Sequence, residues 1–175
     1  MAKAKLWAQF TAIASIGVIH RGHVTEAMNV MRPYLPSAAG SDASRSYYEA
    51  GALYALGLIH APLGVLRDDV VLNYLSANLY KYSTVSQMVH GASLGIGLTA
   101  MGLQNEELCD VLFTCITGGD ALGGEAAAVG IGMVMMGSGN DTIIHNFENV
   151  AQEDNQKEKI IRGTSMGVAL MNLGR

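Results

Sequence analysis

The sequence predicts an all-α protein: tandem helical hairpins that form an arc of an α-α superhelix or toroid, with an inner and an outer layer of helices. Five gap-free copies of a glycine-containing segment recur every 35 to 40 residues, and an amphipathic segment follows each of the first four. In addition, 50% of the residues are hydrophobic and only 15% are charged, against about 25% charged residues in an average soluble domain. Recurrence together with sparse charge indicates stacked units in which one layer of helices is buried.

The recurring segments are SIGVIHRG, ALGLIHAP, GIGLTAMG, GIGMVMMG and GVALMNLG. Their third residue serves as an anchor, and the anchors Gly17, Gly57, Gly97, Gly132 and Ala169 are 40, 40, 35 and 37 residues apart. Two residues before the anchor, the copies have Ser15, Ala55, Gly95, Gly130 and Gly167. Six residues before it, they have Thr11, Gly51, Gly91, Ala126 and Gly163. Five residues after it, they have Gly22, Pro62, Gly102, Gly137 and Gly174.

The anchor segments predict the first helix of each hairpin, 12 to 15 apolar residues long and ended by a glycine in the left-handed conformation. The second helices are predicted from VTEAMNVMRPYL, DDVVLNYLSANLY, NEELCDVLFTCI and DTIIHNFENVAQ. Asn105 and Asp141 are candidates for the starts of two of them, because a side-chain oxygen there accepts a free amide. Strands are disfavoured because alternation with a period of two is absent.

These elements predict a single repeat domain over 1–175, with hairpins at about 5–36, 46–80, 84–117 and 121–153 and an unpaired half repeat at 155–175. The segments 36–46 and 117–124 are the expected linkers. Since the last half repeat has no second helix, the sequence predicts a piece cut from a longer subunit.

Glycines inside helices need a structural reason, because each costs about 1 kcal/mol relative to alanine. At about 100° per residue, the positions six, five and two before the anchor share one sector, and the anchor lies nearly opposite. First helices would therefore have two faces of small residues and allow close approach by a helix on either side. We expect them to stack side by side in an inner layer, with the more charged second helices outside.

Several of these segments resemble a known repeat family. SYYEAGALYALGLIHA (46–61), GASLGIGLTAMG, GEAAAVGIGMVMMG and RGTSMGVALMNLGR resemble the proteasome/cyclosome repeats of the larger non-ATPase repeat subunits of the proteasome regulatory particle. WAQFTAIASIGVIHRGH (7–23) resembles the preceding repeat, so that the resemblance extends over nearly the whole chain. It implies hairpins that close into a ring of two concentric layers, and a non-catalytic scaffold that positions other subunits for ubiquitin-dependent protein degradation.

The resemblance also implies partners. These are other regulatory-particle subunits, with ubiquitin receptors or deubiquitinases docking through regions outside this chain, in the cytoplasm and nucleus. A repeat segment of the largest anaphase-promoting complex subunit, and a module that binds ubiquitin or ubiquitin-like domains, are alternatives. Apolar faces at the repeat ends predict self-association of the isolated chain.

The sequence predicts no catalytic residue, no cofactor and no metal. GIGLTA (95–100) matches a loose dinucleotide fingerprint, but no strand precedes it and its register is that of the repeat. His20 and His60 share one repeat position without further ligands at usable spacing, so a bond to a helix-end carbonyl is favoured. The serines in first helices lack a paired histidine and acid.

Two further features bear on the compartment. The longest weakly polar stretches contain His60 and Glu125, so neither reaches the roughly 18 apolar residues of a membrane-spanning helix. Cys109 and Cys115 are interpreted as small buried thiols of a reducing compartment.

Charge is distributed unevenly. No lysine or arginine lies between Lys81 and Lys157, while nine acidic residues do. This stretch therefore has a net charge near −9, although the net charge of the whole chain is only −4. These acids are Glu106, Glu107, Asp110, Asp120, Glu125, Asp141, Glu148, Glu153 and Asp154. Binding to nucleic acid is disfavoured, since phosphates require clustered basic residues. Glu106, Glu107 and Asp110 are the candidate surface for a basic partner, and a solvated outer layer is the alternative interpretation.

Overall fold

A computed structural model describes residues 2–37, 45–61, 69–118, 120–153 and 156–174. Every regular element within these ranges is helical, which confirms the predicted all-α class. The elements are α1 (Ala2–Ile19), η1 (Val24–Glu26), α2 (Ala27–Met31), α3 (Arg45–His60), α4 (Asp69–Lys81), α5 (Ser86–Thr99), α6 (Glu106–Thr117), α7 (Ala121–Val134), α8 (Asp141–Ala151) and α9 (Glu158–Met171). No helix formed by these residues is long and apolar enough to cross a membrane.

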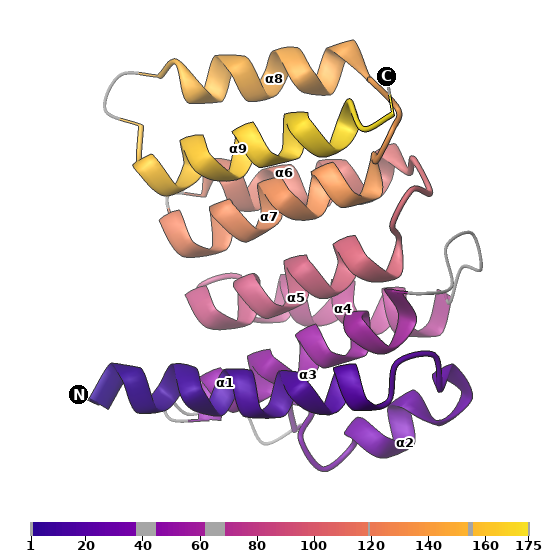
Figure 1. The fold of residues 1–175 in the computed structure, drawn as a ribbon. Helices are drawn as coiled ribbons and strands as arrows, with labels where there is room; N and C mark the ends of the chain where they lie inside the picture. The colour runs from indigo at the N-terminus through magenta and orange to yellow at the C-terminus, as the bar shows by residue number, and fades with distance from the viewer. Residues whose placement is uncertain (1, 38–44, 62–68, 119, 154–155, 175) are drawn as a thin grey trace.

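The helices form two layers. α1, α3, α5, α7 and α9 pack against one another in chain order and form the inner layer (Figure 1). α2, α4, α6 and α8 form the outer layer, and each packs mainly against the inner helix that follows it in the chain. The contacts between layers therefore cross from one sequence repeat into the next.

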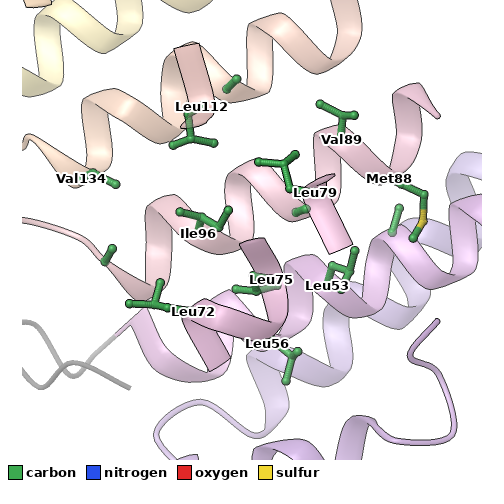
Figure 2. Packing of buried hydrophobic residues seen from close by; sticks show 14 of the residues in the cluster. Leu53, Leu56, Leu72, Leu75, Leu79, Met88, Val89, Ile96, Leu112 and Val134 are labelled. Atoms are coloured by element: carbon green, nitrogen blue, oxygen red, sulfur yellow. The ribbon is translucent and has the colours of Figure 1, made fainter. Parts of the chain in front are cut away.

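A continuous apolar core lies between the layers. Figure 2 shows Leu72, Leu75 and Leu79 of α4 gathered with Leu53 and Ile96 of the neighbouring inner helices. All five side chains are almost completely buried. Each such leucine or isoleucine contributes about 1.5–3 kcal/mol through burial, so this core is the main source of stability for the stack.

The first repeat differs from the others. VTEAMNVMRPYL was expected to form one amphipathic helix, but it contains only the three-residue η1 and the five-residue α2. Pro33 explains the early end, because a proline removes a backbone donor and clashes with the preceding turn. α1 and α3, with 18 and 16 residues, also exceed the expected 12 to 15.

Polar side chains begin three of the later helices. Asn105 accepts a hydrogen bond from the amide of Leu108 at the start of α6, as its position in the sequence predicts. At α8 the capping residue is Asn140, one residue before the expected Asp141. Asp120 caps α7 at Leu122 and Gly123, so that the linker ends earlier than the expected residue 124. Most of the linker expected at 36–46 lies outside the described residues.

The glycines that end inner helices also connect repeats. Gly22, Gly102 and Gly137 have φ values of +85°, +74° and +71°. Their amides donate to the carbonyls of Ile59, Met133 and Leu170 in the next inner helix, at 2.9, 2.9 and 3.1 Å. Gly174 has the same backbone conformation, whereas Pro62, which occupies this position in the second copy, lies outside the described residues. The positive φ of these glycines thus ends an inner helix and directs the glycine amide toward the next inner helix.

Candidate functional site

The inner helices touch through their backbones at the anchor glycines. A Cβ atom added to Gly57 would lie 2.6 Å from Cα of Gly95, closer than real Cβ contacts allow. The same arrangement recurs between Gly97 and Gly130 at 2.8 Å and between Gly132 and Gly167 at 2.5 Å. At the first joint, a Cβ atom on Gly17 would lie 2.5 Å from the carbonyl oxygen of Ala55. The anchor of each helix therefore faces the residue two before the anchor of the next.

A second row of close contacts lies one turn earlier. Gly51 packs on the backbone of Phe10, Gly91 on that of Ala50, and Gly163 on that of Glu125. The structure thus places the anchor on the side of the following helix, and the positions two and six residues earlier on the side of the preceding helix. On α1 the corresponding Thr11 and Ser15 are exposed, as is Ala169 on α9.

Each glycine two before the anchor is also covered from the outer layer. Leu75 covers Gly95, Leu112 covers Gly130, and Phe147 covers Gly167; their nearest side-chain atoms lie 3.2, 3.4 and 2.5 Å from the built Cβ positions. These three residues precede their glycines by 20, 18 and 20 positions. Sequence reasoning missed this contact, although a large apolar residue at that interval was the available signal.

The candidate acidic surface begins α6. Glu106, Glu107 and Asp110 are all exposed in its first two turns. Glu106 and Asp110 line a cleft of about 210 Å³ between α6 and α8, whereas Glu107 does not. Asn140, Thr142 and Asn146 form the opposite wall, and the side-chain Nδ2 of Asn140 donates to Glu106 Oε1 at 3.3 Å. Two carboxylates and several side-chain oxygens in one cleft suit an ammonium or guanidinium group.

The two histidines singled out by the sequence, His20 and His60, lie near the ends of α1 and α3. The rings of His20 and His23 are 5.9 Å apart near the end of α1. His60 is buried, and its Nδ1 lies 2.7 Å from the Leu56 carbonyl oxygen, in the helix-end arrangement expected for it. Among the described residues, no group of three or more histidine, cysteine, aspartate or glutamate residues is placed to hold a metal.

The two thiols are poor nucleophiles. Cys109 is buried in α6, and its burial, with Asp110 and Glu106 nearby, raises its pKa to about 12. Burial also raises the pKa of the half-buried Cys115. A thiol must lose its proton to attack or to bind a metal, so at neutral pH both side chains act as small apolar groups.

Comparison with known proteins identifies similar chains. The sequence model of the family described as proteasome/cyclosome repeat matches residues 11–41. The whole chain is 42% identical to the Eremothecium gossypii protein named 26S proteasome regulatory subunit RPN2, and covers 19% of it. It is 43% identical to 26S proteasome non-ATPase regulatory subunit 1 of Drosophila melanogaster, covering 16% of that protein. The corresponding Arabidopsis thaliana homolog B is 38% identical over the whole chain, with 17% covered. The chain thus spans less than a fifth of the relatives it matches.

Proposed function

Because the chain belongs to the proteasome/cyclosome repeat family, we propose that it is a non-catalytic scaffold segment of the proteasome regulatory particle. Its role would be to hold other subunits in position for ubiquitin-dependent protein degradation, in the cytoplasm and nucleus. The observation that supports a scaffold best is the repeated backbone contact between inner helices, as at Gly57 and Gly95. Such contacts leave little room for one helix to slide on the next.

We infer that the mechanism is geometric. Gly130, for example, meets α5 through its backbone and is covered by Leu112 of α6, while the amide of Gly102 bonds to the end of α7. Most contacts of each unit are with its immediate neighbours, so the shape of the arc is set joint by joint. Subunits bound at different outer helices would then be held at fixed spacing.

We propose in addition that Glu106, Glu107 and Asp110 meet a basic surface of a neighbouring subunit. The exposure of all three supports this, as does the cleft that Glu106 and Asp110 share with α8. The surrounding stretch from 82 to 156 contains no lysine or arginine. A patch of one sign speeds the encounter with a patch of opposite sign and penalises wrong partners.

Charge reversal tests the acidic surface. In the full-length subunit, Glu106→Lys, Glu107→Lys and Asp110→Lys together are expected to reduce incorporation into the regulatory particle, measured by native gel of cell extracts. Glu26→Lys with Glu158→Lys reverses two exposed acids outside the stretch and should leave incorporation unchanged. Normal incorporation of the triple variant would remove the acidic surface from the proposal without affecting the scaffold role.

Capture of the full-length protein from cells tests the scaffold role. Identification of the stable partners is expected to return subunits of the proteasome regulatory particle. Recovery of anaphase-promoting complex subunits instead would contradict the assignment. A direct titration with labelled ubiquitin distinguishes a scaffold from a ubiquitin-binding module, because saturable binding is expected only for the latter.

A further inference from the structure

Three polar residues follow one another across the inner layer. His90 of α5, Glu125 of α7 and Arg162 of α9 each lie seven residues before the anchor of their repeat. The first two copies have Phe10 and Ala50 at this position. Consecutive inner helices therefore carry an imidazole, a carboxylate and a guanidinium in the same register.

The carboxylate in this row is already occupied. Arg162 Nε donates to Glu125 Oε1 at 2.7 Å, and Nη2 of the same guanidinium contacts the same oxygen. This ion pair joins α9 to α7. A carboxylate held by arginine is less able to stabilise a second positive charge on its other side.

The imidazole of His90 joins α5 to the helices on both sides of it. Its ring makes T-shaped contacts with those of Trp7 and Phe10 of α1, at centroid distances of 5.5 and 5.7 Å. Its Nδ1 lies 3.4 Å from the carbonyl oxygen of Leu122 in α7, where a neutral ring donates a hydrogen bond. This contact reaches from α1 to α5 past α3, which has Ala50 at the same register position.

Few charged groups lie close enough to stabilise a proton on the His90 ring. Glu125 and Asp120 face it from α7 and its cap, Lys159 faces it from α9, and Trp7 and Phe10 of α1 are uncharged. Burial lowers the pKa of His90 below its usual value, outweighing the Leu122 bond and the two carboxylates, while Lys159 lowers it further. The ring is therefore neutral at pH 7.

We propose that His90 is a pH-sensitive latch, whose neutral ring holds α1 against α5 and α7. The ion pair between Arg162 and Glu125 sets the pH at which this ring becomes protonated. Because the folded chain binds this proton less readily than the unfolded chain does, the latch contributes fully above the unfolded pKa of about 6.5. Its contribution begins to decline as the pH falls below that value and is lost once the pH is below the lower pKa of the folded chain.

Hydrogen exchange of the α1 amides in the full-length subunit tests the latch. After correction for intrinsic exchange rates, α1 is expected to lose protection between about pH 7.5 and about pH 5.5, the range in which histidine titrates. His90→Gln keeps a donor for the Leu122 carbonyl without a titrating group, so its α1 protection should not depend on pH. His145→Gln, at an exposed histidine of α8, is the matched control and should behave as wild type. Equal protection at both pH values in wild type, or unchanged pH dependence in His90→Gln, would overturn the proposal.

A separate measurement tests whether the Arg162–Glu125 ion pair sets the pH at which His90 is protonated. In the same subunit labelled with carbon-13 histidine, Arg162→Gln frees Glu125 and should raise the titration midpoint of His90. Glu125→Gln removes the carboxylate and should lower it. These opposite shifts test the influence of the Arg162–Glu125 pair even if His90→Gln does not fold, because a ring insensitive to that pair would keep its midpoint in both variants. Unchanged or reversed midpoints would contradict it.

Discussion

Glu49 in α3 is fully buried, and its charge is compensated by one half-exposed partner. Arg45 Nε lies 3.4 Å from Glu49 Oε1, and neither carboxylate oxygen has a hydrogen-bond partner among the described residues. Removing one member of such a pair leaves a buried charge alone, whereas removing both leaves none. The cost of losing the arginine should therefore exceed the cost of losing the pair.

We predict that Arg45→Met lowers the free energy of unfolding by about 1–2 kcal/mol, less than for a pair buried on both sides, because water reaches the guanidinium. Arg45→Met with Glu49→Met should recover most of this loss. Urea midpoints of the three chains measure it. A double variant that is less stable than Arg45→Met would contradict the prediction.

Gln104 is the single non-glycine residue with positive φ in the described ranges, at +53°. Gly139 is its counterpart in the next repeat at +54°, and both donate an amide to the following inner helix at 2.9 Å. A side chain in this conformation costs on the order of 1 kcal/mol.

We predict that Gln104→Gly raises the free energy of unfolding by up to about 1 kcal/mol, reduced in part by the greater freedom of glycine in the unfolded chain. Gln104→Ala keeps the Cβ atom and is the control with no gain. Thermal unfolding compares the two variants. Equal midpoints would show that the strained backbone is relieved elsewhere.

At the scale of the element, glycines determine how closely the inner helices approach one another and where each helix ends. The same residue type serves two purposes: Gly132 admits the backbone of Gly167, whereas Gly137 adopts a positive φ where the helix ends. An alanine would improve helix propensity in the first case, yet the added methyl group would meet backbone atoms that cannot move aside.

We predict that Gly132→Ala lowers the free energy of unfolding by about 1–2 kcal/mol, the cost of overpacking reduced by the gain in propensity. Ala169→Val occupies the same register on the exposed side of α9 and should change stability by less than about 0.5 kcal/mol. Chemical denaturation measures both. A neutral Gly132→Ala would mean that α7 and α9 can separate without loss.

The inner helices were predictable because interior glycines at a fixed period are visible in the sequence itself. The partner of each outer helix was not, since the amphipathic pattern of NEELCDVLFTCI shows an apolar face without showing which helix it meets. The cover of Gly130 by Leu112 follows only from that pairing. Likewise, the acids of α6 could be read from the sequence, but the cleft shared with Asn140 depends on the spacing between α6 and α8.

At the scale of the whole molecule, the described stack leaves apolar side chains exposed at both ends. Met166 and Leu173 of the α9 end are 52% and 59% exposed, and Val18 and Ile19 at the α1 end are 58% and 74% exposed. Exposed apolar side chains at the ends of a repeat stack favour association. Contacts between copies should nevertheless be looser than those within the chain, since Ser15 and Ala169 take the place of glycines.

We predict that the isolated chain associates as its concentration rises, measured by light scattering over a dilution series. Met166→Glu with Leu173→Glu places charges on the α9 end and should shift the series toward monomer. Tyr80→Glu, at an exposed position of α4, is the control that should leave association unchanged. Monomer at every concentration would contradict the prediction.

The pairing of each outer helix with the inner helix that follows it affects where such a chain can be cut. A truncation directly after α6 would leave its buried Cys109, Leu112 and Ile116 without α7, the helix on which they pack. A truncation after α7 would keep the helix on which α6 mainly packs and would remove its lesser contacts with α8, such as the bond from Asn140 to Glu106, so that fraying would begin at an inner helix instead. The natural breakpoint therefore falls in the middle of the hairpin that the sequence repeat outlines.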